Sequence, residues 1–256
     1  MAEPSNKTIL LTDVEGSGRR LDSERPVMRR MLYTVLHETL LAAGVEAGRY
    51  RCEDRGDGVF VLVDPDLPKP PLLRALLSVT TERLVSINRL AAAGAGLRLR
   101  MVVHAGEVAL DEYGAAGADV DHAFRLLEAP SLRAELAATA EPSVLCVSDA
   151  VYRGVVHHAH PGVRREHFHP LAVDSKEGPL RGWYHDASRR HRAEDARSAP
   201  VADAPAAPAP VLRAHTGNFF LGTATIAGDA VAGDKHVGVR TAPRPRPRRE
   251  QEGTGR

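Results

Sequence analysis

Cysteine and aromatic residues are scarce in this chain. Among its 256 residues there are two cysteines, and phenylalanine, tryptophan and tyrosine together make up 4%. Two cysteines this far apart exclude a scaffold held together by several disulfides. Cys52 and Cys146 each lie in an apolar, strand-like segment, so we expect buried free thiols, as in a reducing compartment.

Long apolar runs and an excess of one charge are also missing. No stretch approaches the roughly 20 apolar residues of a membrane-spanning helix. The first residues, Met-Ala-Glu-Pro-Ser-Asn-Lys, lack the apolar region of a secretory signal. The net charge is only +1, which gives no general reason to expect nucleic-acid binding. We therefore expect a cytoplasmic protein with neither a membrane nor a nucleic acid as partner.

The composition changes along the chain and predicts four segments. The apolar share of 43% supports a real core, and a folded domain is expected over residues 1–187. An Ala/Pro-rich, disordered linker follows at 188–212. Residues 213–240 are apolar and β-prone, and 241–256 form a basic, proline-rich tail that is expected to be disordered.

The β-prone segment contains two near repeats, Gly228-Asp229-Ala230-Val231 and Gly233-Asp234-Lys235-His236. A segment too short for its own core can gain stability by stacking with copies of itself. It resembles the glycine-aspartate motifs of bacterial amyloid-like signalling tails, which implies a homotypic partner bound through residues 213–240. The alternative is a strand or hairpin added to the folded domain.

The folded domain begins with an apolar strand, residues 8–12, that ends in Asp13 and opens into the turn Gly16-Ser17-Gly18. Such a turn can direct backbone N–H groups at an anion. A second acid, Asp57, lies in Arg55-Gly56-Asp57-Gly58 and is followed by the apolar run 59–63. Two carboxylates at two strand ends would suit magnesium and phosphate chemistry.

Two later segments complete a pattern. They are Arg98-Leu99-Arg100-Met101-Val102-Val103-His104-Ala105-Gly106-Glu107 and Gly117-Ala118-Asp119-Val120-Asp121-His122-Ala123-Phe124-Arg125. With the two acidic turns, they resemble the catalytic domain of class III nucleotidyl cyclases, the adenylate and guanylate cyclase family, over residues 5–186. The detail is similar to a divergent actinobacterial branch. The resemblance implies the family's α+β, ferredoxin-like sandwich.

The same resemblance implies a two-metal site. Asp13 and Asp57 would be the metal carboxylates, with the backbone carbonyl of Val14 completing the shell of one of two Mg²⁺ or Mn²⁺ ions. Two ions can clamp the attacking and leaving oxygens of a phosphoryl displacement. The backbone N–H groups of Gly16, Ser17 and Gly18 would hold the β- and γ-phosphates.

Three further residues are implied as catalytic. Arg125 would stabilise charge on the α-phosphate. Asp121 occupies the position at which the family has an asparagine that orients the ribose, so the chain departs from the pattern there. Lys176 lies where the family often has a triphosphate-binding lysine before its last strand. His104 is interpreted as a structural or interface residue rather than a base.

Two positions bear on the choice of base. Adenylate cyclases have a lysine, and guanylate cyclases a glutamate, where this chain has Glu53. Adenylate cyclases have an aspartate where this chain has Gly114. A carboxylate can accept hydrogen bonds from guanine N1–H and its amine. The pair excludes the standard adenine reader and leaves guanine, a relaxed preference or no base selection open.

Apolar spacing and turn residues predict the secondary structure. Helices are expected at 25–43, 72–92, 120–127, 131–138 and 149–155, a proline-rich connector at 65–71, and further strands at 50–53, 59–63, 97–103, 108–110, 144–147 and 180–185. This order indicates an α+β sandwich with helices on one face of a mostly antiparallel sheet.

Family sites are shared across a dimer, so the resemblance implies a homodimer. Two functions stay open. The protein is either an enzyme that converts a nucleoside triphosphate to a 3′,5′-cyclic nucleotide and pyrophosphate, or a silent pseudo-cyclase. The silent protein would dimerise or bind nucleotide and signal through its C-terminal motif.

Overall fold

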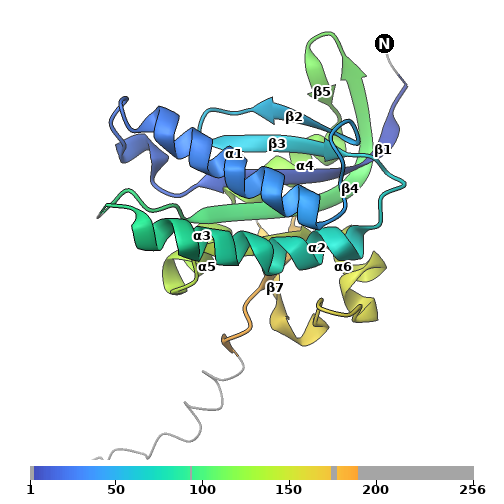
Figure 1. Cartoon of the computed structure of the whole chain (residues 1–256). Coiled ribbons are helices and arrows are strands. Elements are labelled where there is room, and N and C mark those ends of the chain that lie inside the picture. Colours follow the sequence, from blue (N-terminus) through green and yellow to red (C-terminus); the bar gives the residue numbers. More distant parts are fainter. Residues whose placement is uncertain (1–2, 93, 174–177, 190–256) are drawn as a thin grey trace, which may run out of the picture. The chain divides into compact units, whose positions relative to one another are not determined.

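A central strand organises the sheet in the computed structural model, which describes residues 3–92, 94–173 and 178–189. β1 (Ser5–Val14) lies between β3 and β4 in an eight-stranded sheet of order β2-β3-β1-β4-β6-β8-β7, with β5 paired to β4 (Figure 1). The other strands are β2 (Tyr50–Asp54), β3 (Gly58–Val63), β4 (Leu99–Asp111), β5 (Gly114–Ala116), β6 (Ser143–Ser148), β7 (Phe168–Val173) and β8 (Leu180–His185). Neighbouring strands are antiparallel except β4 and β6, which are parallel.

The expected α+β class is confirmed, but helices cover both faces of the sheet, not one. The helices are α1 (Arg25–Ala42), α2 (Lys69–Leu77), α3 (Val79–Leu90), α4 (Ala118–Glu128), α5 (Pro130–Ala138) and α6 (Asp149–Gly154). One apolar cluster joins the sheet to α1, α2, α3 and α6, and a second joins it to α4 and α5. In Figure 1 the first three helices lie in front of the strands and α4 lies behind them.

The two clusters follow from the alternation of side chains along β1. Leu10 and Val14 belong to the first cluster, whereas Ile9 and Leu11 belong to the second. Successive side chains of a strand point to opposite faces, so a continuous apolar run can fill two cores at once. Asp13 therefore falls on the same face as Leu11, the face covered by α4 and α5.

Other sequence-based boundaries need correction. The expected helix 72–92 is two helices, because the chain bends at Ser78, whose hydroxyl donates to the carbonyl of Arg74 at 2.8 Å. A serine hydroxyl that bonds back to the preceding turn commonly bends a helix. Part of the expected proline connector is helical, since α2 begins at Lys69 and places Pro70 and Pro71 in its first turn.

Two strand predictions also change. The strands expected at 97–103 and 108–110 are one strand, β4, because Gly106 keeps an extended conformation in register with Lys7 of β1. β7 was not predicted at all. Its sequence, Phe-His-Pro-Leu-Ala-Val, carries a proline, which is tolerated because β7 is an edge strand.

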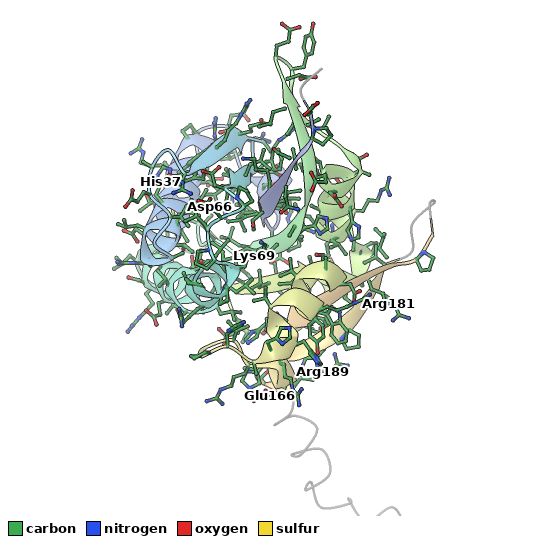
Figure 2. The ribbon with its side chains drawn as sticks, turned by 90° about the vertical axis from the view of Figure 1, so that its right-hand side faces the viewer. His37, Asp66, Lys69, Glu166, Arg181 and Arg189 are labelled. Carbon is green, nitrogen blue, oxygen red and sulfur yellow. The ribbon has the colours of Figure 1, made fainter. Side chains whose placement is uncertain are left out.

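Within the described residues, no helix is long and apolar enough to cross a membrane. The β4–β5 hairpin extends beyond the other strands in both views (Figures 1 and 2). Most of the linker expected at 188–212, the segment 213–240, the tail 241–256 and Lys176 lie outside the described residues.

Candidate active site

The two predicted metal carboxylates line one cleft. Asp13 is near the end of β1, and Asp57 lies in the turn between β2 and β3. The backbone N–H of Val14 donates to the Asp57 carbonyl at 3.0 Å, which ties the turn to the strand end. The cleft has a volume of about 310 Å³, and it is lined by Asp13, Val14, Glu15, Gly16, Ser17, Gly18, Asp57, Arg100 and Arg133.

The glycine turn closes one side of this cleft. Gly16 has φ 69°, in the left-handed region that glycine adopts without strain. This conformation starts a short 3₁₀ turn, Ser17–Arg19. The Ser17 hydroxyl donates to Oδ2 of Asp57 at 2.5 Å. The structure therefore brings the predicted residues of both acidic turns together.

Arg100 is a member of the site that the sequence analysis did not identify. It lies on β4 directly opposite Asp13 in the antiparallel register, and its Nε donates to Asp13 Oδ2 at 3.1 Å. A second guanidinium nitrogen bonds the same oxygen. Both side chains are largely buried, with 12% of Arg100 and 19% of Asp13 exposed. The available signal was an arginine inside an otherwise apolar strand.

Burial and the neighbouring arginines shift the pKa of the Asp13 carboxyl in opposite directions. Desolvation raises the pKa of its carboxyl, and the nearby Asp57 charge adds to this rise, whereas Arg100 and Arg133 lower it. A carboxylate that is both desolvated and next to a second acid gains from a nearby cation. Arg133 reaches this cleft from α5, which no motif in the sequence indicated.

The donor chemistry fits divalent cations. Two carboxylates and the nearby backbone carbonyls are hard oxygen ligands, and Mg²⁺ commonly uses one or two carboxylates plus substrate phosphates. A cation bound to Asp13 would neutralise the carboxylate charge that Arg100 neutralises in its absence. Among the described residues no group of three or more His, Cys, Asp or Glu side chains is arranged to hold a metal, so phosphate oxygens would be needed to complete a shell.

Glu53 and Gly114 also come together, although they are 61 positions apart in the sequence. A Cβ placed on Gly114 would lie 3.7 Å from Oε2 and 3.8 Å from Oε1 of Glu53. Glu53 is near the end of β2, and its cross-strand partner is Phe60 of β3. Because Phe60 packs in the cluster under α4 and α5, Glu53 and Asp13 lie on the same face of the sheet.

Arg125 and Asp121, the other predicted catalytic residues within the described part of the chain, do not line the cleft of Asp13 and Asp57. Arg125 and Asp121 both lie on α4, where Asp121 is exposed and Arg125 is partly buried. The pKa of His122 is lowered mainly by burial of its ring and next by the charge of the neighbouring His104. The Arg125 charge adds a smaller decrease.

His104 connects three elements on the α4 side of the sheet. Its ring is 3% exposed; Nδ1 lies 2.7 Å from the Ser148 hydroxyl and Nε2 lies 3.0 Å from Oδ1 of Asp119. The ring stacks on His122 with centroids 4.7 Å apart. These contacts fix the position of α4 against β4 and β6 and leave neither ring nitrogen of His104 unpaired.

A larger cavity of about 530 Å³ lies elsewhere, between α2, α3 and the β6–β8 region. Its lining includes Leu76, Met101, His167, Tyr184 and His185. It contains none of the predicted site residues and no phosphate-binding turn, so we place the candidate site in the smaller, more strongly charged cleft.

Comparison with known proteins gives a match of fold only. No family model and no curated protein sequence matches the chain. Among solved structures, an adenylate/guanylate cyclase/hydrolase from Silicibacter pomeroyi is similar, with 19% identity, a TM-score of 0.52, and coverage of 72% of this chain and 98% of that one.

Two further structures agree. The guanylyl cyclase Cya2 has 16% identity, a TM-score of 0.50, and coverage of 72% of this chain and 94% of its own. A bacterial light-regulated adenylyl cyclase has 15% identity, a TM-score of 0.51, and coverage of 72% and 51%. The described domain therefore has the fold of adenylate and guanylate cyclase catalytic domains.

Proposed function

We propose that the protein is a class III-type nucleotidyl cyclase, which converts a nucleoside triphosphate to a 3′,5′-cyclic nucleotide and pyrophosphate. The observation that carries this proposal is the cleft in which Asp13, Asp57, a glycine turn and two arginines meet. Oxygen donors for cations and nitrogen donors for phosphates are combined there, which is the chemistry that a metal-bound triphosphate requires.

Each group in the cleft has a role in this proposal. Asp13, Asp57 and the Val14 carbonyl would hold two Mg²⁺ or Mn²⁺ ions, which supply charge neutralisation for the attacking 3′-hydroxyl and the leaving pyrophosphate. Backbone N–H groups of Gly16, Ser17 and Gly18 would receive the β- and γ-phosphates. Arg100, released from Asp13, would turn its guanidinium to the same phosphates.

A homodimer would complete the site. In one chain, Arg125 on α4 does not line the cleft of Asp13 and Asp57. A two-fold related partner could place its own Arg125, Asp121 and Lys176 across that cleft, where an arginine can stabilise charge on the α-phosphate. Asp121 would then face the ribose, whose hydroxyls can donate to its carboxylate. We expect the isolated monomer to be inactive.

The test is turnover by the full chain. Purified protein is incubated with each of the four ribonucleoside triphosphates and Mg²⁺ or Mn²⁺, and mass spectrometry follows cyclic nucleotide and pyrophosphate. We expect a cyclic product, and we expect Asp57→Ala to lower its rate by roughly 10²-fold or more, because the variant removes a charge that positions the transition state.

The matched control is Asp22→Ala, since the Asp22 side chain is 99% exposed and lies outside the cleft. This variant should keep the wild-type rate. Light scattering on the same samples gives the oligomeric state. Equal turnover in Asp57→Ala and Asp22→Ala would contradict the metal assignment.

The alternative is a silent pseudo-cyclase, favoured by one observation: Arg100 already occupies the carboxylate of Asp13. In that case the domain would dimerise or bind nucleotide without turnover, and output would come from homotypic assembly of residues 213–240. Folded, dimeric protein that makes no cyclic product from any triphosphate would support this second function.

A further inference from the structure

A cluster of charged and aromatic side chains surrounds Glu53, and one member has no role in the scheme above. Arg55 donates from a guanidinium nitrogen to Oε2 of Glu53 at 3.2 Å. Its guanidinium carbon lies 5.4 Å from the ring centroids of both Phe60 and Phe124. Aromatic faces attract guanidinium groups and limit their motion. Arg55 is therefore held beside Glu53 although 46% of its side chain is exposed.

The carboxylate of Glu53 is only partly satisfied. Its side chain is 20% exposed, and Oε1 is buried without a hydrogen bond from any described residue. Arg51 lies 3.2 Å from Oε1 as an ion pair, but it is not aligned as a hydrogen-bond donor. A buried carboxylate oxygen without a donor is costly, so a ligand N–H group that takes the place of the half-exposed Arg51 side chain beside Oε1 would gain from it.

Gly114 leaves space beside this carboxylate. A Cβ at this position would already be in van der Waals contact with both Glu53 oxygens, at 3.7 and 3.8 Å. A longer side chain would extend from there over the carboxylate. The φ of 130° at this position also favours glycine. The absence of a side chain at Gly114 thus leaves room for a ligand edge beside Glu53.

We propose that Arg55 is a specificity-determining residue that reads the Watson–Crick edge of guanine together with Glu53. Its guanidinium donates to O6, while the Glu53 carboxylate accepts from N1–H and the 2-amino group. Guanine offers this order of one acceptor and two donors. Adenine places an amino group where guanine has O6, so two donors would meet at Arg55. The assignment rests on the proposed function, because it deepens the substrate choice of the same protein.

The experiment measures binding without turnover. Full-length protein with Mg²⁺ is titrated by calorimetry with 3′-deoxy forms of GTP, ITP and ATP, which lack the attacking hydroxyl. The inosine base keeps O6 and N1–H but lacks the 2-amino group. Wild-type protein should bind GTP most tightly, then ITP, then ATP.

The variants separate the two readers. Arg55→Ala should weaken GTP and ITP binding alike, by about 10- to 100-fold, which is the worth of one good base contact, and should leave ATP binding unchanged. Arg55→Lys should recover part of the loss, because it keeps one donor. Glu53→Gln should bring the GTP to ITP affinity ratio close to one.

The control is Arg181→Ala. Arg181, labelled in Figure 2, is exposed like Arg55, but it lies on β8, near the opposite edge of the sheet from β2. It should not alter any affinity. Thermal unfolding of every variant shows whether loss of the contacts with Phe60 and Phe124 disturbs the fold.

The outcomes distinguish the two proposals. If wild-type protein binds none of the three triphosphates, the proposed function fails and this assignment fails with it. If it binds them without preference, or if Arg55→Ala weakens all three equally in a folded protein, only the assignment of Arg55 is overturned.

Discussion

Gly58 is the residue at which side-chain size is most tightly limited near the carboxylate cleft. A Cβ there would lie 2.2 Å from the backbone carbonyl oxygen of Thr12. The register pairs Asp13 with Gly58 and Thr12 with Val59. A substitution at Gly58 would therefore push β3 away from β1 at the point where both carboxylates are positioned.

We expect Gly58→Ala to lower the free energy of unfolding by about 1–3 kcal/mol or more, the usual cost of overpacking. Urea denaturation measures it. Gly154→Ala is the matched control, because a Cβ at Gly154 meets nothing within 4 Å. A denaturation midpoint for Gly58→Ala as high as that of the control would show that the strands can separate without cost.

Individual site residues could be predicted from the sequence where a short motif contains them. They could not be predicted where their contacts depend on the register between strands. Asp13, Ser17 and Asp57 could be proposed because Ser17 and Asp57 lie in short turn motifs and Asp13 directly precedes one. Arg100 could not, because its pairing with Asp13 depends on the antiparallel alignment of β1 and β4, 87 positions apart. Arg55 likewise gains its role only when α4 brings Phe124 over β3.

α5 is the element that adds a charge to the cleft. The side of this helix that carries Leu132 and Leu136 is buried. Arg98 bonds the Leu136 carbonyl and donates to the Thr139 carbonyl at 3.0 Å, so the C-terminal end of α5 is fixed to the residue that precedes β4. Arg133, on its exposed side, lines the cleft of Asp13 and Asp57.

Arg133→Ala should therefore weaken binding of inorganic tripolyphosphate with Mg²⁺ by roughly 3- to 10-fold, because an exposed cation contributes on the order of 1 kcal/mol. Calorimetry measures this without any nucleotide. Arg153→Ala is the control, since Arg153 is exposed and pairs with Asp149 on α6. Equal affinities for the two variants would remove Arg133 from the site.

Elements were predictable to the extent that their own residues determine them. The apolar period of α1 gave its bounds nearly to the residue. The division between α2 and α3 was missed because it depends on one hydrogen bond, from the Ser78 hydroxyl to the Arg74 carbonyl. β7 was missed because its proline is tolerated only at an edge, and edge position is a property of the whole sheet.

His185, at the end of β8, is a partly buried base with a strongly shifted pKa. Burial, with smaller contributions from the neighbouring His167 and His169 and against the opposing charge of Asp186, lowers the pKa of His185 to about 4. His185 also stacks edgewise on Phe168, with centroids 5.2 Å apart. It is therefore neutral in the folded protein at physiological pH.

The sign of the pH effect follows from this neutral form. Between pH about 6.5 and about 4 the unfolded chain binds a proton that folded His185 does not, so stability falls as the pH falls through that window. The loss is at most about 3 kcal/mol. His185→Gln should show a shallower loss of melting temperature from pH 7 to pH 4.5 than wild type.

His158→Gln serves as the comparison, because His158 is exposed, and it should follow the wild-type curve. A His185→Gln curve parallel to wild type would mean that other groups account for the acid sensitivity.

The α+β class could be read from the order of elements, whereas the coverage of both faces could not, because apolar runs do not reveal to which face each helix packs.

The central position of β1 has a consequence for how the chain is made. Its partners are β3, which ends at Val63, and β4, which ends at Asp111. At about 5–20 residues per second on the ribosome, roughly 5–20 s pass between synthesis of β1 and completion of β4. Between the completion of β3 and that of β4, β1 can be paired on one side only. The first strand synthesised thus keeps one unpaired edge until residue 111 has emerged, and until then that edge is exposed to aggregation and chaperone capture.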